Sequence, residues 1–118
     1  REAVSRMAWP AFSALLEQAF ARDGWTVTRP RADSHDFVLE RQGRRMMVSA
    51  RRWKSAQTGL ETLRTLQTAR EQADVADALL IGLGELSDAA RPFAASQRIA
   101  VWRAEELAQA LRGLLLGR

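Results

Sequence analysis

The apolar residues of the chain recur with two different spacings, which divide the sequence into predicted helices and strands. Apolar residues at helical spacing predict helices, over residues 9–25, 58–74, 88–97 and 104–116. Alternating or continuous apolar residues predict strands, over residues 25–29, 36–41, 45–53, 77–83 and 98–102. No internal repeat interrupts this succession.

Residues at the ends of these elements support the assignment. Pro10 suits the first turn of a helix, and Thr58 with Glu61 has the spacing of a capping box. Gly43 lies in a short loop, so the strands on either side of it should form an antiparallel hairpin. Pro92 lies inside the predicted third helix, which it should bend or shorten.

The predicted order of elements is αβββαβαβα. A meander of strands that feeds a helix, followed by alternating strands and helices, favours an α/β fold with a mixed sheet and helices on both faces. A chain of 118 residues fits one compact domain. We expect a flexible lead-in over residues 1–8 and a single domain over residues 9–116.

Composition removes several classes of chemistry. The chain has no Cys and no Tyr, and its one His is His35. Disulfides, zinc–thiolate sites, a Cys nucleophile and multi-histidine metal sites are therefore excluded. Carboxylates, Ser and Thr hydroxyls, Arg and the single Lys54 remain as candidate chemical groups.

No apolar run approaches the roughly 20 residues that a membrane-spanning helix needs, and no signal-peptide pattern opens the chain. We therefore expect no lipid contact from this segment and a cytoplasmic location. The chain begins with Arg1 rather than Met, so further domains or a membrane anchor could precede it.

The positive charge is concentrated in one segment. The net charge is +4, but residues 29–54 hold eight basic and three acidic residues, which makes that segment alone +5. A localised basic patch is typical of a protein that binds a phosphate backbone. An abundance of Arg and Ala can also arise from GC-rich codons, in which case the patch has no function.

Several ordered motifs resemble one known family. They are an opening helix ending in "RDGWTV", the hairpin "DFVLERQGRRMMVSARRWKS", the buried strand "ALLIGLG" and the closing segment "LSDAARPFAASQRIAVWRAEELAQAL". From Trp9 to Leu111 this set is similar to the Mrr-type catalytic domain of the restriction-endonuclease-like superfamily. The resemblance implies a bacterial metal-dependent DNA endonuclease, built on a restriction-endonuclease-like mixed sheet flanked by helices.

The resemblance also implies a degenerate catalytic site. Asp36 matches the family's metal-binding Asp, but Ser49 stands where active members have Gln or Glu, and Arg51 stands where they have Lys. Strand alternation predicts that Ser49, Arg51, Met47 and Trp53 share one face. Hydroxyl oxygen is a weak Mg²⁺ ligand, and Arg is a poor proton carrier.

A second carboxylate for a metal is hard to place from sequence. The family usually has an acid after the Phe of its opening helix, but Ser13 follows Phe12 here. Glu40 lies about 13 Å along the strand from Asp36, and nothing places Glu17 nearby. Mg²⁺ is therefore the expected cofactor if the site is active, and none is expected otherwise.

Basic residues of the hairpin are candidates for nucleic-acid contact. Arg44 and Arg45 at the turn could touch phosphates or simply protect a strand edge. Arg52 and Lys54 flank Trp53, which could stack on a base or pack in the core.

Three hypotheses remain. The first is a nuclease-fold domain that binds DNA with catalysis degraded or lost. The second is an active Mg²⁺-dependent endonuclease of the type IV restriction kind with a variant site. The third is a protein-interaction or regulatory module without nucleic acid. The sequence leaves DNA against RNA undecided, and a homodimer is possible.

Overall fold

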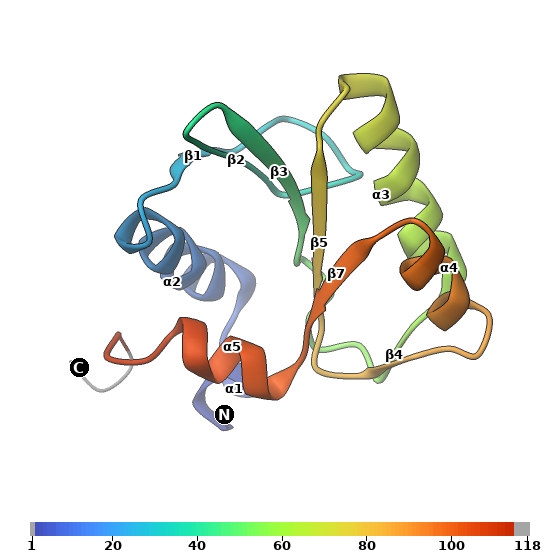
Figure 1. Cartoon of the computed structure of the whole chain (residues 1–118). Coiled ribbons are helices and arrows are strands. Elements are labelled where there is room, and N and C mark those ends of the chain that lie inside the picture. The colour runs from blue at the N-terminus through green and yellow to red at the C-terminus, as the bar shows by residue number, and fades with distance from the viewer. Residues whose placement is uncertain (1, 115–118) are drawn as a thin grey trace.

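The computed structural model describes residues 2–114, in which a mixed β-sheet lies between two layers of helices (Figure 1). Its helices are α1 (Glu2–Arg6), α2 (Trp9–Arg22), α3 (Leu60–Ala73), α4 (Ala90–Ser96) and α5 (Ala104–Ala110). Its strands are β1 (Thr26–Thr28), β2 (Phe37–Arg41), β3 (Arg44–Ser49), β4 (Gln57–Thr58), β5 (Asp77–Ile81), β6 (Glu85–Leu86) and β7 (Ile99–Trp102).

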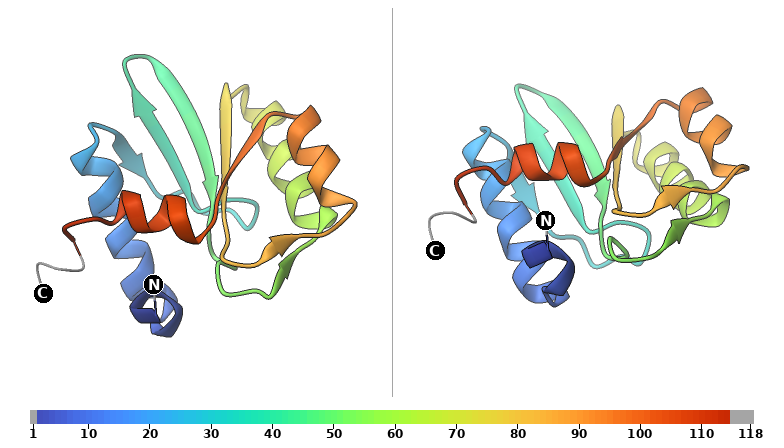
Figure 2. Two further views of the ribbon diagram at one scale, coloured as in Figure 1. Left: turned by 60° about the horizontal axis from the view of Figure 1, so that its bottom comes forward. Right: turned by 90° about the horizontal axis from the view of Figure 1, so that it is seen from below.

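The main sheet has the strand order β1-β2-β3-β5-β7. β1, β2 and β3 pair antiparallel, whereas β3, β5 and β7 run parallel. α2 and α5 lie on one face, with α1 beside them, and α3 and α4 lie on the other face (Figure 2). The predicted mixed sheet flanked by helices is confirmed, and its elements follow the predicted order with α1, β4 and β6 in addition.

Strand alternation divides the core between the two faces of the sheet. Val48 of β3 packs in the cluster beneath α2, whereas its neighbour Met47 packs in the cluster beneath α3 and α4. β5 is buried on both faces, since Leu79 belongs to the first cluster and Leu80 to the second. The continuous apolar run that predicted this strand reflects that double burial.

The β2–β3 hairpin closes through a two-residue turn. Gln42 and Gly43 both have positive φ, at 54° and 78°, and Arg41 pairs with Arg44 across the turn. Positive φ at both central residues matches the right-handed twist of the flanking strands. The hairpin register follows from this turn, and it sets which residues lie at the far ends of β2 and β3.

A small parallel pair, β4 with β6, was not predicted. It ties the segment before α3 to the segment after β5. Gly84 permits the close approach, because a Cβ at this position would lie 2.3 Å from the carbonyl oxygen of Ala56. Two residues per strand are too few for a sequence pattern to reveal.

Two expectations at the starts of helices are corrected, and the one about Pro92 is confirmed. Residues 2–6 of the expected lead-in form α1, and Val4 is 3% exposed because it packs in the core. The predicted capping box is absent, since Thr58 lies in β4 and Gly59 is the N-cap of α3. The shortening expected from Pro92 is observed: α4 begins at Ala90, so Pro92 is its third residue, within the first turn, where a helix tolerates the missing N–H.

The last predicted helix is shorter than expected. α5 ends at Ala110, and a turn follows over residues 111–114. The remainder of that prediction, residues 115–116, lies outside the described residues. Within residues 2–114, no helix is long and apolar enough to cross a membrane.

Many arginines close the C-terminal ends of helices. The last carbonyl groups of a helix lack intrahelical partners and carry partial negative charge, so they attract cations. Guanidinium groups donate to such carbonyls at the ends of α2, α3, α4 and α5, from Arg41, Arg45, Arg70 and Arg22 respectively. Part of the high Arg content therefore has a structural role.

Candidate functional site

Asp36, Ser49 and Arg51 lie around one cavity of about 480 Å³. Asp36 directly precedes β2 and Ser49 ends β3, and antiparallel pairing of these strands brings the two residues to the same end of the hairpin. The cavity lies between this end of the sheet and the start of α3. Its other lining residues are Asp33, Ser34, Arg52, Glu61, Thr62 and Thr65.

Donors of the protein itself hold the Asp36 carboxylate. Its Oδ2 accepts hydrogen bonds from the backbone N–H groups of Ala50, at 2.7 Å, and Arg51, at 2.9 Å. Its Oδ1 accepts from Nε of Arg51 at 3.2 Å, and the Asp36 side chain is only 8% exposed. Asp36 therefore caps the turn that follows β3.

Arg51 lies in that turn and not in a strand. β3 ends at Ser49, and a turn follows in which the N–H of Trp53 donates to the carbonyl of Ala50 at 3.1 Å. The predicted strand over residues 45–53 is therefore wrong after residue 49. The turn places the guanidinium of Arg51 beside Asp36 and 5.0 Å from the ring centroid of Trp9.

Trp53 is a core residue, so of the two roles expected for it the structure supports packing in the core and not base stacking. The chain reverses after β3, so Trp53 packs on the α2 side of the sheet, opposite Met47. It is 3% exposed and stacks on Phe12 with ring centroids 4.3 Å apart. Its indole Nε1 donates to the carbonyl of Val4 at 3.3 Å. A base has no access to this ring.

Arg44 and Arg45 lie at the other end of the hairpin, four residues and about 13 Å along the strand from the Asp36 end. Arg44 makes a bidentate ion pair with Asp77, at 2.6 and 3.0 Å, which raises the pKa of Arg44 above its ordinary value. Arg45 donates to the C-terminal carbonyls of α3. The basic residues of the hairpin are thus divided between two separate places.

Arg52 and Lys54 are exposed in the turn after β3. Arg52 lines the cavity, and its guanidinium has no hydrogen bond or ion pair with any residue in the described range 2–114. The ammonium of Lys54 lies 5.1 Å from the ring centroid of Trp53. Both charges are therefore available to a ligand at this end of the sheet.

The residues at the site do not fit a divalent metal ion. In the part of the chain that the structure describes, no three His, Cys, Asp or Glu side chains come together as metal ligands. Both Asp36 oxygens already accept hydrogen bonds, and Ser49 offers only a hydroxyl. Glu17 pairs with Arg29 at 2.9 Å, and Arg29 also donates to Ser13, so neither Glu17 nor Ser13 lines the cavity.

His35 adjoins the site through the backbone. Burial lowers the pKa of His35, and the nearby charge of Asp36 opposes this by a smaller amount. The Ser34 hydroxyl lies 2.7 Å from Nδ1 of His35. The folded protein therefore favours the neutral imidazole.

The α3 side of the cavity was not predicted from the sequence. Glu61, Thr62 and Thr65 contribute there, together with Asp33 from the loop before β2. A signal was present, because residues three and four positions apart share one face of a helix, as Thr62 with Thr65 and Glu61 with Thr65 do, and α3 begins soon after the turn. Glu61, which lies outside segment 29–54, makes the cavity less positive than the charge of that segment suggested.

The chain is similar to a known protein family and to a solved structure. The family model Mrr_cat, described as restriction endonuclease, matches residues 4–111. No curated protein sequence matches the chain. A crystal structure of a protein of unknown function, AF1548, is similar with a TM-score of 0.54 and 19% identity, which shows the fold alone. The match covers 74% of this chain and only 56% of that one.

Proposed function

Because the chain belongs to the Mrr-type restriction endonuclease family, we propose that it is a nuclease-fold domain that binds DNA without hydrolysing it. The DNA contact lies at the end of the sheet that carries Arg51, Arg52 and Lys54. The observation that carries the proposal is the engagement of Asp36 by the protein's own donors, including the guanidinium of Arg51.

Loss of hydrolysis follows from the chemistry of the site. Restriction endonucleases typically depend on Mg²⁺, and metal-assisted hydrolysis needs a fixed ion and an activated water. Asp36 is the one retained acid of the family pattern. Two backbone N–H groups donate to its Oδ2, and an ion at its Oδ1 would compete with the guanidinium of Arg51. The guanidinium of Arg51 cannot serve as the proton acceptor for water, because a guanidinium has only N–H donors and no acceptor.

Binding rests on charges that the fold leaves exposed to solvent. The Arg51 side chain is 67% exposed, and Arg52 has no partner within residues 2–114. With Lys54 they form a cluster within four consecutive residues of one turn. Such a cluster favours phosphate oxygens through charge and does not select a base sequence. We therefore expect weak sequence preference.

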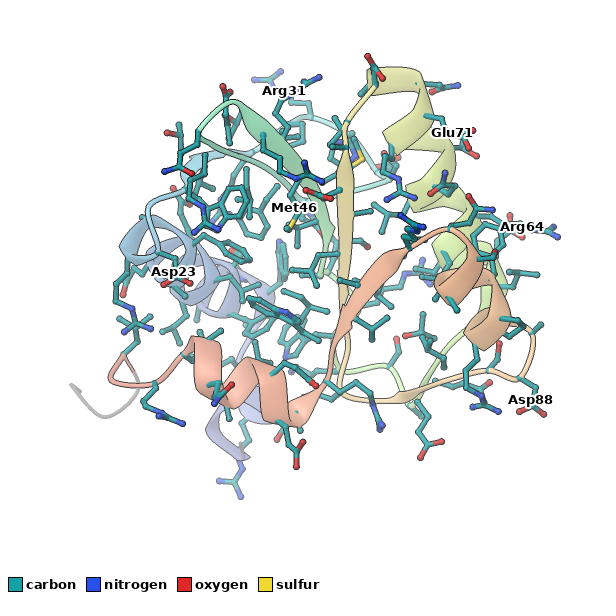
Figure 3. All side chains as sticks on the ribbon, viewed as in Figure 1. Asp23, Arg31, Met46, Arg64, Glu71 and Asp88 are labelled. Carbon is teal, nitrogen blue, oxygen red and sulfur yellow. The ribbon has the colours of Figure 1, made fainter. Side chains whose placement is uncertain are left out.

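The test is the salt dependence of affinity for a duplex of about 20 base pairs, measured by fluorescence anisotropy. The logarithm of the affinity should fall linearly with the logarithm of salt concentration. Arg52→Gln should reduce the slope by about one. Arg64→Gln is the matched control, since Arg64 points outward from α3 (Figure 3). An affinity that does not change with salt contradicts the proposal.

An active endonuclease with a variant site is the second candidate. The family match and the position of Asp36 on the cavity favour it. It differs from the first candidate in one outcome, which is metal-dependent cleavage that Asp36→Ala abolishes. A module without nucleic-acid binding is the outcome if no DNA or RNA binds at low salt.

A further inference from the structure

A second cavity, of about 160 Å³, lies beside the first at the start of α3. The two cavities share Ser49, Arg52 and Thr62. The smaller one is completed by Ser55, Gln57, Thr58, Gly59, Leu80 and Ile81. Its polar lining groups are hydroxyls, an amide and a guanidinium, and none of its lining residues is Asp or Glu. The cavity is therefore rich in donors and has no carboxylate.

The hydroxyls of this cavity are not used by the protein. In the described range 2–114, the side chains of Ser49, Ser55, Thr58 and Thr62 make no hydrogen bond. Thr58 is the most informative of them, because the residue is only 8% exposed. No fully buried polar side-chain atom in the described chain lacks a partner, so the Thr58 hydroxyl reaches solvent, and the cavity that it lines is the opening.

The N-terminal end of α3 adds backbone donors. α3 has 14 residues, and its N-cap Gly59 leaves the helix without any side-chain cap. The first N–H groups of a helix have no intrahelical partner, and the helix dipole favours an anion there. A Cβ at Gly59 would meet nothing within 4 Å, so packing does not require glycine. Glycine here leaves the backbone N–H groups open to a ligand.

One positive charge in the cavity and one negative charge close to it affect the binding of an anion. Arg52 supplies a guanidinium that no described residue neutralises. Glu61 in the first turn of α3 opposes an anion, but it lines the larger cavity and not this one. Removal of the Glu61 charge should therefore strengthen anion binding here.

We propose that this cavity binds one phosphate group of a nucleic-acid strand, through Arg52, the hydroxyls of Thr58 and Thr62, and the N-terminal backbone of α3. The identification of the strand rests on the proposed function, whereas the phosphate chemistry rests on the cavity. A water occupies roughly 30 Å³ in the liquid, so the volume admits a phosphate with a few waters. The phosphate could be a terminal monoester or an internal diester.

The first experiment titrates inorganic phosphate into the ¹⁵N-labelled chain and follows amide signals by NMR. Signals of residues 59–62 should shift, and Thr58→Val should weaken binding about tenfold, as expected for one lost hydrogen bond to a charged group. Thr68→Val on exposed α3 surface is the matched control and should leave affinity unchanged. Glu61→Gln, which leaves the cavity wall intact, should strengthen binding about threefold.

Dispersed spectra of Thr58→Val establish that the variant folds. If that variant does not fold, Arg52→Gln takes its place and should weaken binding by a similar factor. Phosphate-induced shifts confined to other parts of the chain, or equal affinity in the wild type and these variants, overturn the proposal.

The second experiment compares oligonucleotides of one sequence with a 5′-phosphate or a 5′-hydroxyl. If Thr58→Val weakens only the 5′-phosphorylated strand, the cavity binds a terminal monoester; if it weakens both equally, the cavity binds an internal diester. DNA binding that Thr58→Val does not affect overturns the cavity and leaves the proposed function standing. If inorganic phosphate binds at the cavity but the chain binds no DNA, the phosphate site stands and the proposed function is overturned.

Discussion

Nε of Arg51 lies 3.2 Å from Oδ1 of Asp36, so a cation of the protein occupies the carboxylate that active relatives would offer to a metal. A Lys at this position would have a single flexible ammonium, whereas the planar guanidinium of Arg stays charged at all working pH values. Under the proposed function, this pair competes with a metal ion for the Asp36 carboxylate. Asp36 is left with a structural function.

Asp36 and Arg51 should therefore differ in their effect on stability. Asp36→Ala leaves the buried N–H of Ala50 without a partner and should lower the free energy of unfolding by about 2 kcal/mol. Arg51→Ala removes an exposed pair and should cost about 0.5 kcal/mol. Denaturant unfolding measures both. Equal effects would mean that the turn does not depend on Asp36.

The two ends of the hairpin should separate in function. Arg45→Ala removes donors to the C-terminal carbonyls of α3 and should lower stability by about 0.5 kcal/mol, with DNA affinity within about twofold of the wild type. Arg52→Gln should instead weaken DNA binding and leave stability unchanged. Anisotropy and thermal unfolding of both variants test this, and a large loss of DNA affinity in Arg45→Ala contradicts the assigned interface.

The sequence predicted the site only where local patterns decide geometry. The short antiparallel hairpin was predicted, and its pairing brings Asp36 and Ser49 to the same end of the sheet. The same alternation failed for Arg51 and Trp53, because the chain leaves the sheet after Ser49 and a turn reverses the faces. Burial of Trp53 depends on Phe12, which is distant in sequence, and no local pattern reports such a contact.

Residues 1–8 should contribute to stability, although we expected a flexible lead-in. Val4 is buried against the core, and its carbonyl accepts from the indole of Trp53. A chain that begins at Trp9 should lose about 2 kcal/mol of unfolding free energy, the value for burial of one Val side chain. Thermal unfolding of the truncated and full chains gives the comparison. Identical midpoints would restore residue 9 as the domain boundary.

For the fold as well, local sequence patterns predict only part of the structure. Long periodic segments such as α2 and β5 were predicted, because each carries its own apolar pattern. α1 has only five residues, and β4 and β6 have two each. Tertiary contacts form these elements, as the approach of Gly84 to Ala56 illustrates. The loss of the capping box at Thr58 has the same cause, because pairing with β6 takes that residue into a strand.

His35 should make stability fall in mild acid. Its pKa is lowered in the folded protein from 6.5, so the unfolded chain binds the proton more tightly. The contribution of neutral His35 is complete above pH 6.5 and is lost as the pH falls below it. Unfolding midpoints from about pH 7.5 to about pH 5.5 should decrease, and His35→Gln should reduce that decrease. A rise in stability with acid would contradict this assignment.

A double variant provides a positive control for catalysis. Ser49→Gln supplies an amide oxygen, and Arg51→Lys restores the family's basic residue and frees Oδ1 of Asp36. Cleavage by this variant and not by the wild type would indicate that Ser49 and Arg51, in place of the family's residues, abolish hydrolysis in the natural chain.

The most direct measurement is plasmid cleavage by the wild-type chain in Mg²⁺ and in Mn²⁺, at a concentration where a gel shift confirms that the DNA is bound. The predicted result is a shifted plasmid that remains uncut, because Asp36 is engaged by Arg51 and by the backbone. Metal-dependent cleavage by the wild type that Asp36→Ala abolishes would contradict it.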